Sequence, residues 1–127
     1  MSNAPTVLLG LVPLFRAVVR SATDASTCTV TPDDSGTLFV SLSTAAIKYT
    51  LPAVADGAGK CFGFFAAGTT SQSVKVASTA ANLFGGDGAA NIVATSASNF
   101  ADSCLVIGDG TYYYLLAFGG TWTIVAT

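Results

Sequence analysis

The sequence contains no histidine and no glutamate, and all seven of its acidic residues are aspartates. Histidine and glutamate are among the most frequent general acids and bases, and histidine is the commonest metal ligand. The remaining candidates, Asp, Lys, Tyr and Cys, form no adjacent pair that resembles a nucleophile and its activating base. The sequence therefore predicts a protein that is not an enzyme, with no cofactor and no catalytic metal.

Charge is also scarce. Only 9% of the 127 residues are charged and 51% are hydrophobic, whereas about 25% of a typical soluble domain is charged. Such a surface exposes apolar patches unless something covers it, so we expect an obligate oligomer or a protein lying against a larger assembly. The alternative is a monomer covered by serine and threonine. A net charge of −2 without a basic cluster argues against nucleic-acid binding.

The three cysteines, Cys28, Cys61 and Cys104, form no CxxC pair, and without histidine they do not complete a zinc site. All three lie in segments typical of strands, so we expect reduced, buried thiols in a protein made in a cytoplasm. A disulfide between two of them stays open. The aspartates, nearly all beside glycine or serine, are expected to cap turns. They show no calcium-loop spacing, which leaves a surface calcium site undecided.

Two further patterns exclude other classes of protein. Gly59-Lys60 resembles the end of a phosphate-binding loop, but Val54 stands where the loop needs glycine and Cys61 where it needs Ser or Thr. The apolar run 7–12 is too short to span a membrane, and the chain start lacks the charges of a secretory signal. We therefore expect no nucleotide site and a soluble protein made inside a cell.

From Cys28 onward, short β-branched and aromatic runs are separated by turn residues. The segments 38–43 and 46–51 alternate apolar and polar residues, which is typical of a strand with one covered face. This pattern predicts an all-β protein, with residues 28–127 forming a single antiparallel β-sandwich or small barrel-like domain. Gly119-Gly120 lies between two β-rich runs and predicts a hairpin.

Residues 1–27 are predicted to form an extended N-terminal arm or an edge strand. Residues 14–20 would also fit two helical turns, but the β-branched Val18 and Val19 and two nearby prolines favour an extended chain. An apolar arm before a compact domain is typical of elements that pack on a neighbour. Its candidate contact residues for a subunit or capsid are Val7, Leu8, Leu9, Leu11, Val12, Leu14, Phe15 and Arg16.

Three consecutive tyrosines follow an Asp-Gly turn near the C-terminus. In a strand, Tyr112 and Tyr114 point to one face and Tyr113 to the other, so the three do not form one stacking platform. We expect the core to cover one face and a neighbouring subunit or sheet the other, because tyrosine is enriched at interfaces. The alternative is a glycan-binding ledge of Tyr112, Tyr114 and Trp122.

Residues 35–123 resemble a small β module that recurs in virion proteins of tailed bacteriophages. The likeness consists of a Thr-Leu-Pro-Ala strand end, a glycine-containing loop before an aromatic strand, and a late Asp-Gly-Thr hairpin that closes with Gly-Thr-Trp. Residues 1–27 match nothing in these modules. The residues that carry the likeness are Thr50, Leu51, Pro52, Ala53, Gly57, Phe62, Phe64, Asp109, Gly110, Thr111, Tyr113, Gly120, Thr121 and Trp122.

Such modules occur as capsid decoration (cement) proteins, as head-fibre pieces and as parts of tail fibres, usually as homotrimers. The resemblance implies a virion structural protein, made in the host cytoplasm. The short chain favours a homotrimeric decoration protein that binds the major capsid protein on the outer capsid surface. The alternatives are a receptor- or carbohydrate-binding tip of a phage fibre, and a cellular β-sandwich subunit unrelated to phages.

Overall fold

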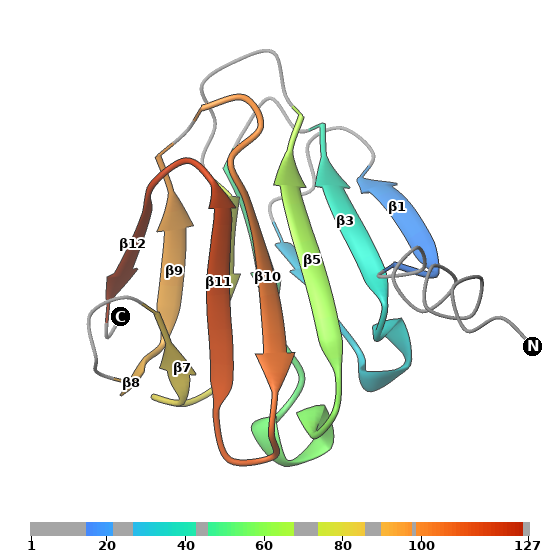
Figure 1. Cartoon of the computed structure of the whole chain (residues 1–127), viewed down its shortest axis with the longest axis vertical. Helices are drawn as coiled ribbons and strands as arrows, with labels where there is room; N and C mark the ends of the chain where they lie inside the picture. The colour runs from blue at the N-terminus through green and yellow to red at the C-terminus, as the bar shows by residue number, and fades with distance from the viewer. Residues whose placement is uncertain are drawn as a thin grey trace, which may run out of the picture.

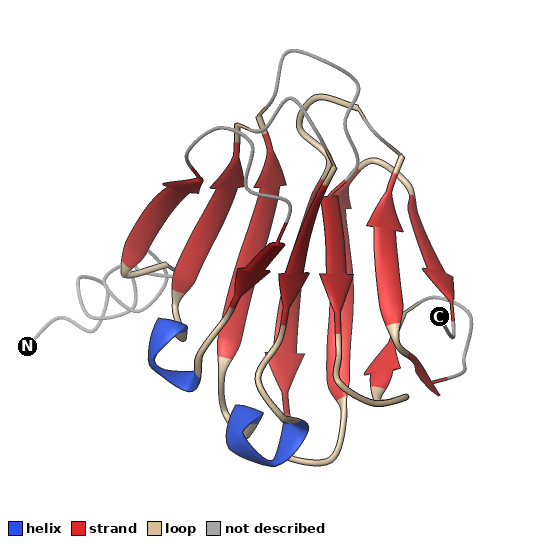
Figure 2. Ribbon diagram, turned by 180° about the vertical axis from the view of Figure 1, so that it is seen from behind, coloured by secondary structure: helices blue, strands red, loops and turns tan. Residues whose placement is uncertain are grey.

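A computed structural model describes residues 15–21, 27–42, 46–67, 74–85, 90–97 and 99–125. These residues form two β-sheets that face each other, as Figures 1 and 2 show. Their only helical elements are two single turns, η1 (Pro32–Asp34) and η2 (Val54–Gly57). The predicted all-β sandwich is therefore confirmed. No helix among the described residues has the length and apolar character needed to cross a membrane.

The seven-stranded sheet, called the larger sheet below, has the order β1-β3-β5-β10-β11-β7-β8. Its strands are β1 (Ala17–Ser21), β3 (Thr37–Ser41), β5 (Cys61–Ala66), β7 (Leu83–Phe84), β8 (Ala90–Asn91), β10 (Ser103–Gly108) and β11 (Tyr113–Gly119). The smaller sheet has the order β12-β9-β6-β4-β2. Its strands are β2 (Thr27–Thr29), β4 (Ile47–Thr50), β6 (Val74–Ala77), β9 (Val93–Ser96) and β12 (Trp122–Val125).

The first half of the chain winds between the two sheets. Strands β1, β3 and β5 lie parallel in the larger sheet, and β2, β4 and β6 lie parallel in the smaller one. Each strand crosses to the opposite sheet before the chain returns, so neighbours within a sheet run the same way. The expected purely antiparallel sandwich is thus a pair of mixed sheets. Apolar alternation has period two in both kinds of sheet and does not distinguish them.

The second half of the chain contains the antiparallel hairpin of β10 and β11. Its turn is Asp109-Gly110, where Gly110 has a φ of +92°. The prediction of a hairpin at Gly119-Gly120 is wrong, because β11 belongs to the larger sheet and β12 pairs with β9 in the smaller one. Gly120, at φ +74°, is the place where the chain crosses between sheets.

The core lies between the sheets. At its centre are the rings of Phe39, Tyr49 and Phe64, whose centroids lie 5.1–5.6 Å apart. Other fully buried core side chains are Val30, Ile47, Leu51, Phe62, Val74, Val76, Leu83, Val106 and Tyr113.

Strand β1 falls in the segment predicted as an arm or edge strand. It pairs along its length with β3 and forms one edge of the larger sheet.

Candidate interaction surface

The outward face of the smaller sheet has a polar row of side chains across all five strands. Strand pairing places one residue from each of its five strands in a continuous cross-strand row. Threonine and lysine are suited to such a face, because threonine is β-branched and lysine keeps its charge in water. This sheet thus has one face in the core and one face fit for solvent. The row consists of Thr27, Lys48, Lys75, Thr95 and Thr123.

The outward face of the larger sheet is apolar. One cross-strand row on it contains Val18, Leu38, Gly63, Leu105 and Leu116. No described side chain that faces outward from β3, β5, β7, β10 or β11 carries a charge. We call this surface the outer apolar face. It is formed by Val18, Leu38, Phe65, Ile107, Leu116 and Phe118, with Phe84, Tyr112 and Tyr114 at one border and Phe100 at another, whereas Leu105 on the same side is buried.

Several side chains of the outer apolar face are substantially exposed. Leu116 is 47% exposed, and Phe118 and Phe100 are 69% and 70% exposed. The ring of Phe100 contacts Phe65 edge-on, with centroids 6.2 Å apart. Phe100 is followed by Ala101, whose φ of +68° is unusual for a residue with a Cβ. The loop after β9 thus holds a strained residue while it presents an aromatic ring to the outside.

An aromatic cluster borders this face beside the β10–β11 turn. The ring of Phe84 stacks on Tyr114 with an interplanar angle of 12°, and it meets Tyr112 edge-on at 4.7 Å between centroids. The Tyr114 hydroxyl donates a 2.7 Å hydrogen bond to Asp109 Oδ2, while Asp109 Oδ1 accepts from the backbone N–H groups of Thr111 and Tyr112. Donors from Tyr112, Tyr114 and Thr111 lower the pKa of Asp109. Its predicted role as a turn cap is confirmed.

The predicted alternation of the tyrosines is also confirmed. Tyr113 is fully buried, whereas Tyr112 and Tyr114 are exposed on the opposite face. The Tyr113 hydroxyl donates a 2.7 Å hydrogen bond to the carbonyl of Pro52. Burial and then the negative charge of Asp56 raise the pKa of Tyr113 to about 12. Tyr113 therefore joins the last hairpin to the loop after β4.

Trp122 does not join the two exposed tyrosines. It lies beyond the other end of β11, on β12 of the smaller sheet, and packs partly against the core. Its Nε1 lies 3.2 Å from the carbonyl oxygens of Ser103 and Gly119 and donates to them. The aromatic partner of Tyr112 and Tyr114 is Phe84 instead. Sequence reasoning missed Phe84 because its strand has two residues in a glycine-rich stretch and pairs with a distant segment.

Of the predicted arm residues, Val7, Leu8, Leu9, Leu11, Val12 and Leu14 lie outside the described residues. Phe15 packs on the outer apolar face, where a Cβ at Gly63 would collide with its ring. Arg16 binds its own domain, since its Nε donates a 2.7 Å hydrogen bond to the carbonyl of Ser35 and its Nη2 donates to that of Asp33. These two residues thus hold the start of β1 against the sandwich.

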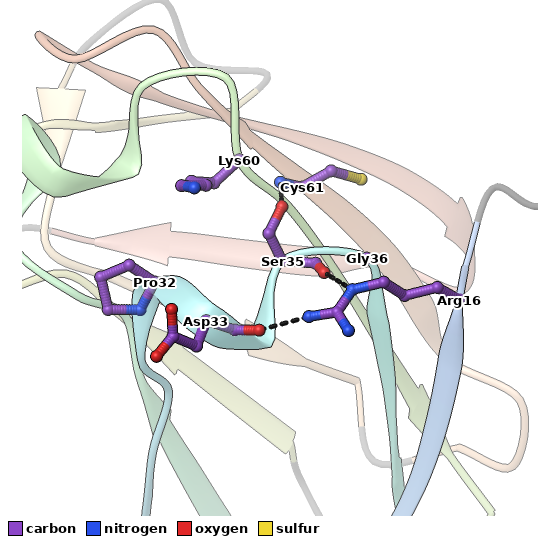
Figure 3. Close-up of a pocket in the computed structure, with 7 residues that line it drawn as sticks. All are labelled: Arg16, Pro32, Asp33, Ser35, Gly36, Lys60 and Cys61. Atoms are coloured by element: carbon purple, nitrogen blue, oxygen red, sulfur yellow. Dashed lines mark hydrogen bonds between the residues drawn. The ribbon is translucent and has the colours of Figure 1, made fainter.

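Arg16 also lines an open depression of about 520 Å³ beside η1 (Figure 3). The other side chains around it include Asp33, Lys60 and Cys61. Burial raises the pKa of the Cys61 thiol, which disfavours the reactive thiolate. All three cysteines are free, as expected, but only Cys104 is buried, whereas Cys28 and Cys61 are partly exposed. Among the described residues, no three His, Cys, Asp or Glu side chains gather closely enough to hold a metal ion.

Comparisons with protein-family models, with curated proteins and with solved structures find no match to this chain. A proposed function must therefore be argued from the structure, and the outer apolar face is the most distinctive feature of the described residues.

Proposed function

We propose that this protein is a structural subunit of a tailed-bacteriophage virion: a capsid decoration protein that binds the major capsid protein on the outer capsid surface as a homotrimer. The observation that carries the proposal is the outer apolar face, a broad uncharged surface on one side of the sandwich. Exposed apolar patches larger than a few hundred Å² mark interaction sites. A protein with this face is therefore expected to work inside an assembly.

The size of the exposed apolar surface supports a stable assembly. The partly exposed rings and aliphatic side chains of this face present about 600 Å² to solvent, if an aromatic side chain has about 200 Å² and an aliphatic one somewhat less. At about 25 cal/mol per Å², covering this area contributes about 15 kcal/mol before costs. Association costs about 4–15 kcal/mol, so the gain from covering this face is comparable to or larger than the cost.

The resemblance of residues 35–123 to phage virion modules directs this assembly role to a virion. In a homotrimer, three N-terminal arms would reach the capsid together. Such multivalency strengthens binding without any new kind of contact.

The direct test is binding to purified capsids that lack the protein. We expect the purified chain to sediment with these capsids and to saturate them at a ratio of three copies per binding position. Capsids already occupied by the native protein serve as the control and should take up none. A chain that stays in the supernatant at every concentration, although it is folded by circular dichroism, would contradict the proposed function.

A second candidate function is a receptor- or carbohydrate-binding tip, and the aromatic cluster of Phe84, Tyr112 and Tyr114 favours it. Exposed aromatic rings are suited to stacking on a sugar ring, and a carboxylate beside them can accept hydrogen bonds from the sugar hydroxyl groups. Asp109 supplies that carboxylate, although it already binds Tyr114. A glycan array that gives signal with the native chain and none with Tyr112→Ala would support this function. An array without signal would refute it.

A further inference from the structure

The two outward faces of the sandwich differ in chemistry although they occupy equivalent places in the fold. In a two-layer β domain, each sheet normally turns an apolar face to the core and a polar face to water. The smaller sheet follows this pattern with its threonine and lysine row. The larger sheet departs from it, because Ile107, Leu116 and Phe118 face outward. Its outward face is therefore built for a second contact.

We infer that copies of this chain bind one another through the outer apolar face, which in the proposed homotrimer turns toward the threefold axis and meets the same face of both neighbours. This inference rests on the proposed function and names the surface that would hold the homotrimer together. A standard protein interface buries about 800 Å² on each partner. The exposed side chains of this face present about 600 Å², and the half-buried Leu38, Phe65 and Phe84 extend it toward that size.

Charge favours a second copy over an unrelated partner. Strands β3, β5, β7, β10 and β11 present no described charged side chain outward, so they offer nothing to a partner with a charged surface. An uncharged sheet face is complementary to other such faces, because the apolar side chains of facing sheets interdigitate. Tyr112 and Tyr114 at the border fit this arrangement, since a tyrosine ring can be covered while its hydroxyl stays hydrated.

The experiment compares two matched lysine substitutions in the full chain. Ile107 on the outer apolar face is 38% exposed, and Val125 on the smaller sheet is 39% exposed. Both are β-branched strand residues, so Ile107→Lys and Val125→Lys place the same charge at equally accessible positions on opposite sides of the sandwich. Leu116→Lys is a second variant on the face. Masses are measured by light scattering and sedimentation over a range of concentrations.

We expect the native chain and Val125→Lys to form the same oligomer. Ile107→Lys and Leu116→Lys should be monomers under the same conditions, because an unpaired charge buried in an interface raises the dissociation constant at least about 100-fold. Covalent labelling of Tyr112 and Tyr114 in the native chain should fall as concentration rises. This measurement needs no variant and therefore does not depend on whether the lysine chains fold.

Two results would overturn the inference. One is an oligomer of unchanged affinity in both face variants. The other is a monomeric native chain, which would point to residues 1–14 of the same chain as the cover, since Phe15 already packs on this face. Capsid sedimentation separates this inference from the proposed function. A monomer that binds capsids refutes the inference and the trimeric state but leaves the virion role intact, whereas an oligomer that ignores capsids refutes only the virion role.

Discussion

The hydrogen bond from Tyr113 to Pro52 gives a sharp test of what stabilises the sandwich. The phenol is fully buried, and its hydroxyl lies 2.7 Å from the Pro52 carbonyl oxygen. Tyr113→Phe removes the donor and leaves this carbonyl without its partner, which costs about 1.5 kcal/mol of unfolding free energy. For a domain of this size we expect the Tm to fall by about 5 °C. Thermal and urea unfolding followed by circular dichroism measure both quantities.

The neighbouring residue provides a matched control. The Tyr114 hydroxyl also donates a 2.7 Å hydrogen bond, to Asp109, but Tyr114 is 41% exposed. Water replaces a lost bond at an exposed site, so Tyr114→Phe should leave the Tm unchanged. If the two substitutions have the same effect, or if Tyr113→Phe is neutral, burial does not decide the contribution of this bond and the reasoning fails.

Alkaline pH tests the same residue independently. The pKa of Tyr113 is raised to about 12 in the folded protein, whereas tyrosine in an unfolded chain ionises near pH ~10. Between these values the unfolded chain has lost a proton that the folded chain retains, so stability falls as pH rises from about 10 to 12. Below pH ~10 this residue causes no pH dependence. In Tyr113→Phe this part of the alkaline loss should be absent.

Three further predictions concern the backbone and the thiols. Ala101→Gly should raise the unfolding free energy in urea by up to about 1 kcal/mol, because it relieves a φ of +68°. Gly120→Ala should lower the same quantity by about 2 kcal/mol or more, since φ is +74° and the new Cβ would collide with the buried carboxylate of Asp102. Cys104 should be the last thiol alkylated at pH 8, as measured by peptide mass mapping, because burial hides its sulfur and raises its pKa.

The sequence predicts the strands well and their partners poorly. Alternation places Tyr113 on the opposite face of the strand from Tyr112 and Tyr114, because side-chain direction in a strand is a local property. Pairing is not local. Gly119-Gly120 has the composition of a hairpin turn, yet Gly120 leads the chain to the other sheet past Asp102. The positive φ that favours glycine is present there, but it serves a crossing between sheets.

The candidate surface shows the same limit. Ile107 on β10 and Leu116 on β11 belong to one apolar surface only because β10 pairs with β5 on one side and with β11 on the other. A single strand pattern contains no information about these neighbours. Trp122 shows the reverse error, since a residue close in sequence to the tyrosines belongs to another sheet. The outer apolar face therefore could be suspected from composition and located only in three dimensions.

The charges of the described residues are unevenly distributed, and this distribution bears on why charge is so scarce. Four of the five described aspartates, Asp33, Asp34, Asp56 and Asp109, lie in η1, η2 and the β10–β11 turn, which gather at one end of the sandwich (Figure 1). Lys48 and Lys75 lie on the outward face of the smaller sheet, among threonines. The scarcity of charged residues has two explanations, a surface covered by threonine or an apolar surface covered by a partner. The outward face of the smaller sheet fits the threonine-covered surface, and that of the larger sheet fits the surface covered by a partner. A monomer with uniformly diluted charge would show neither contrast, so the segregation favours one face in water and the other in an assembly.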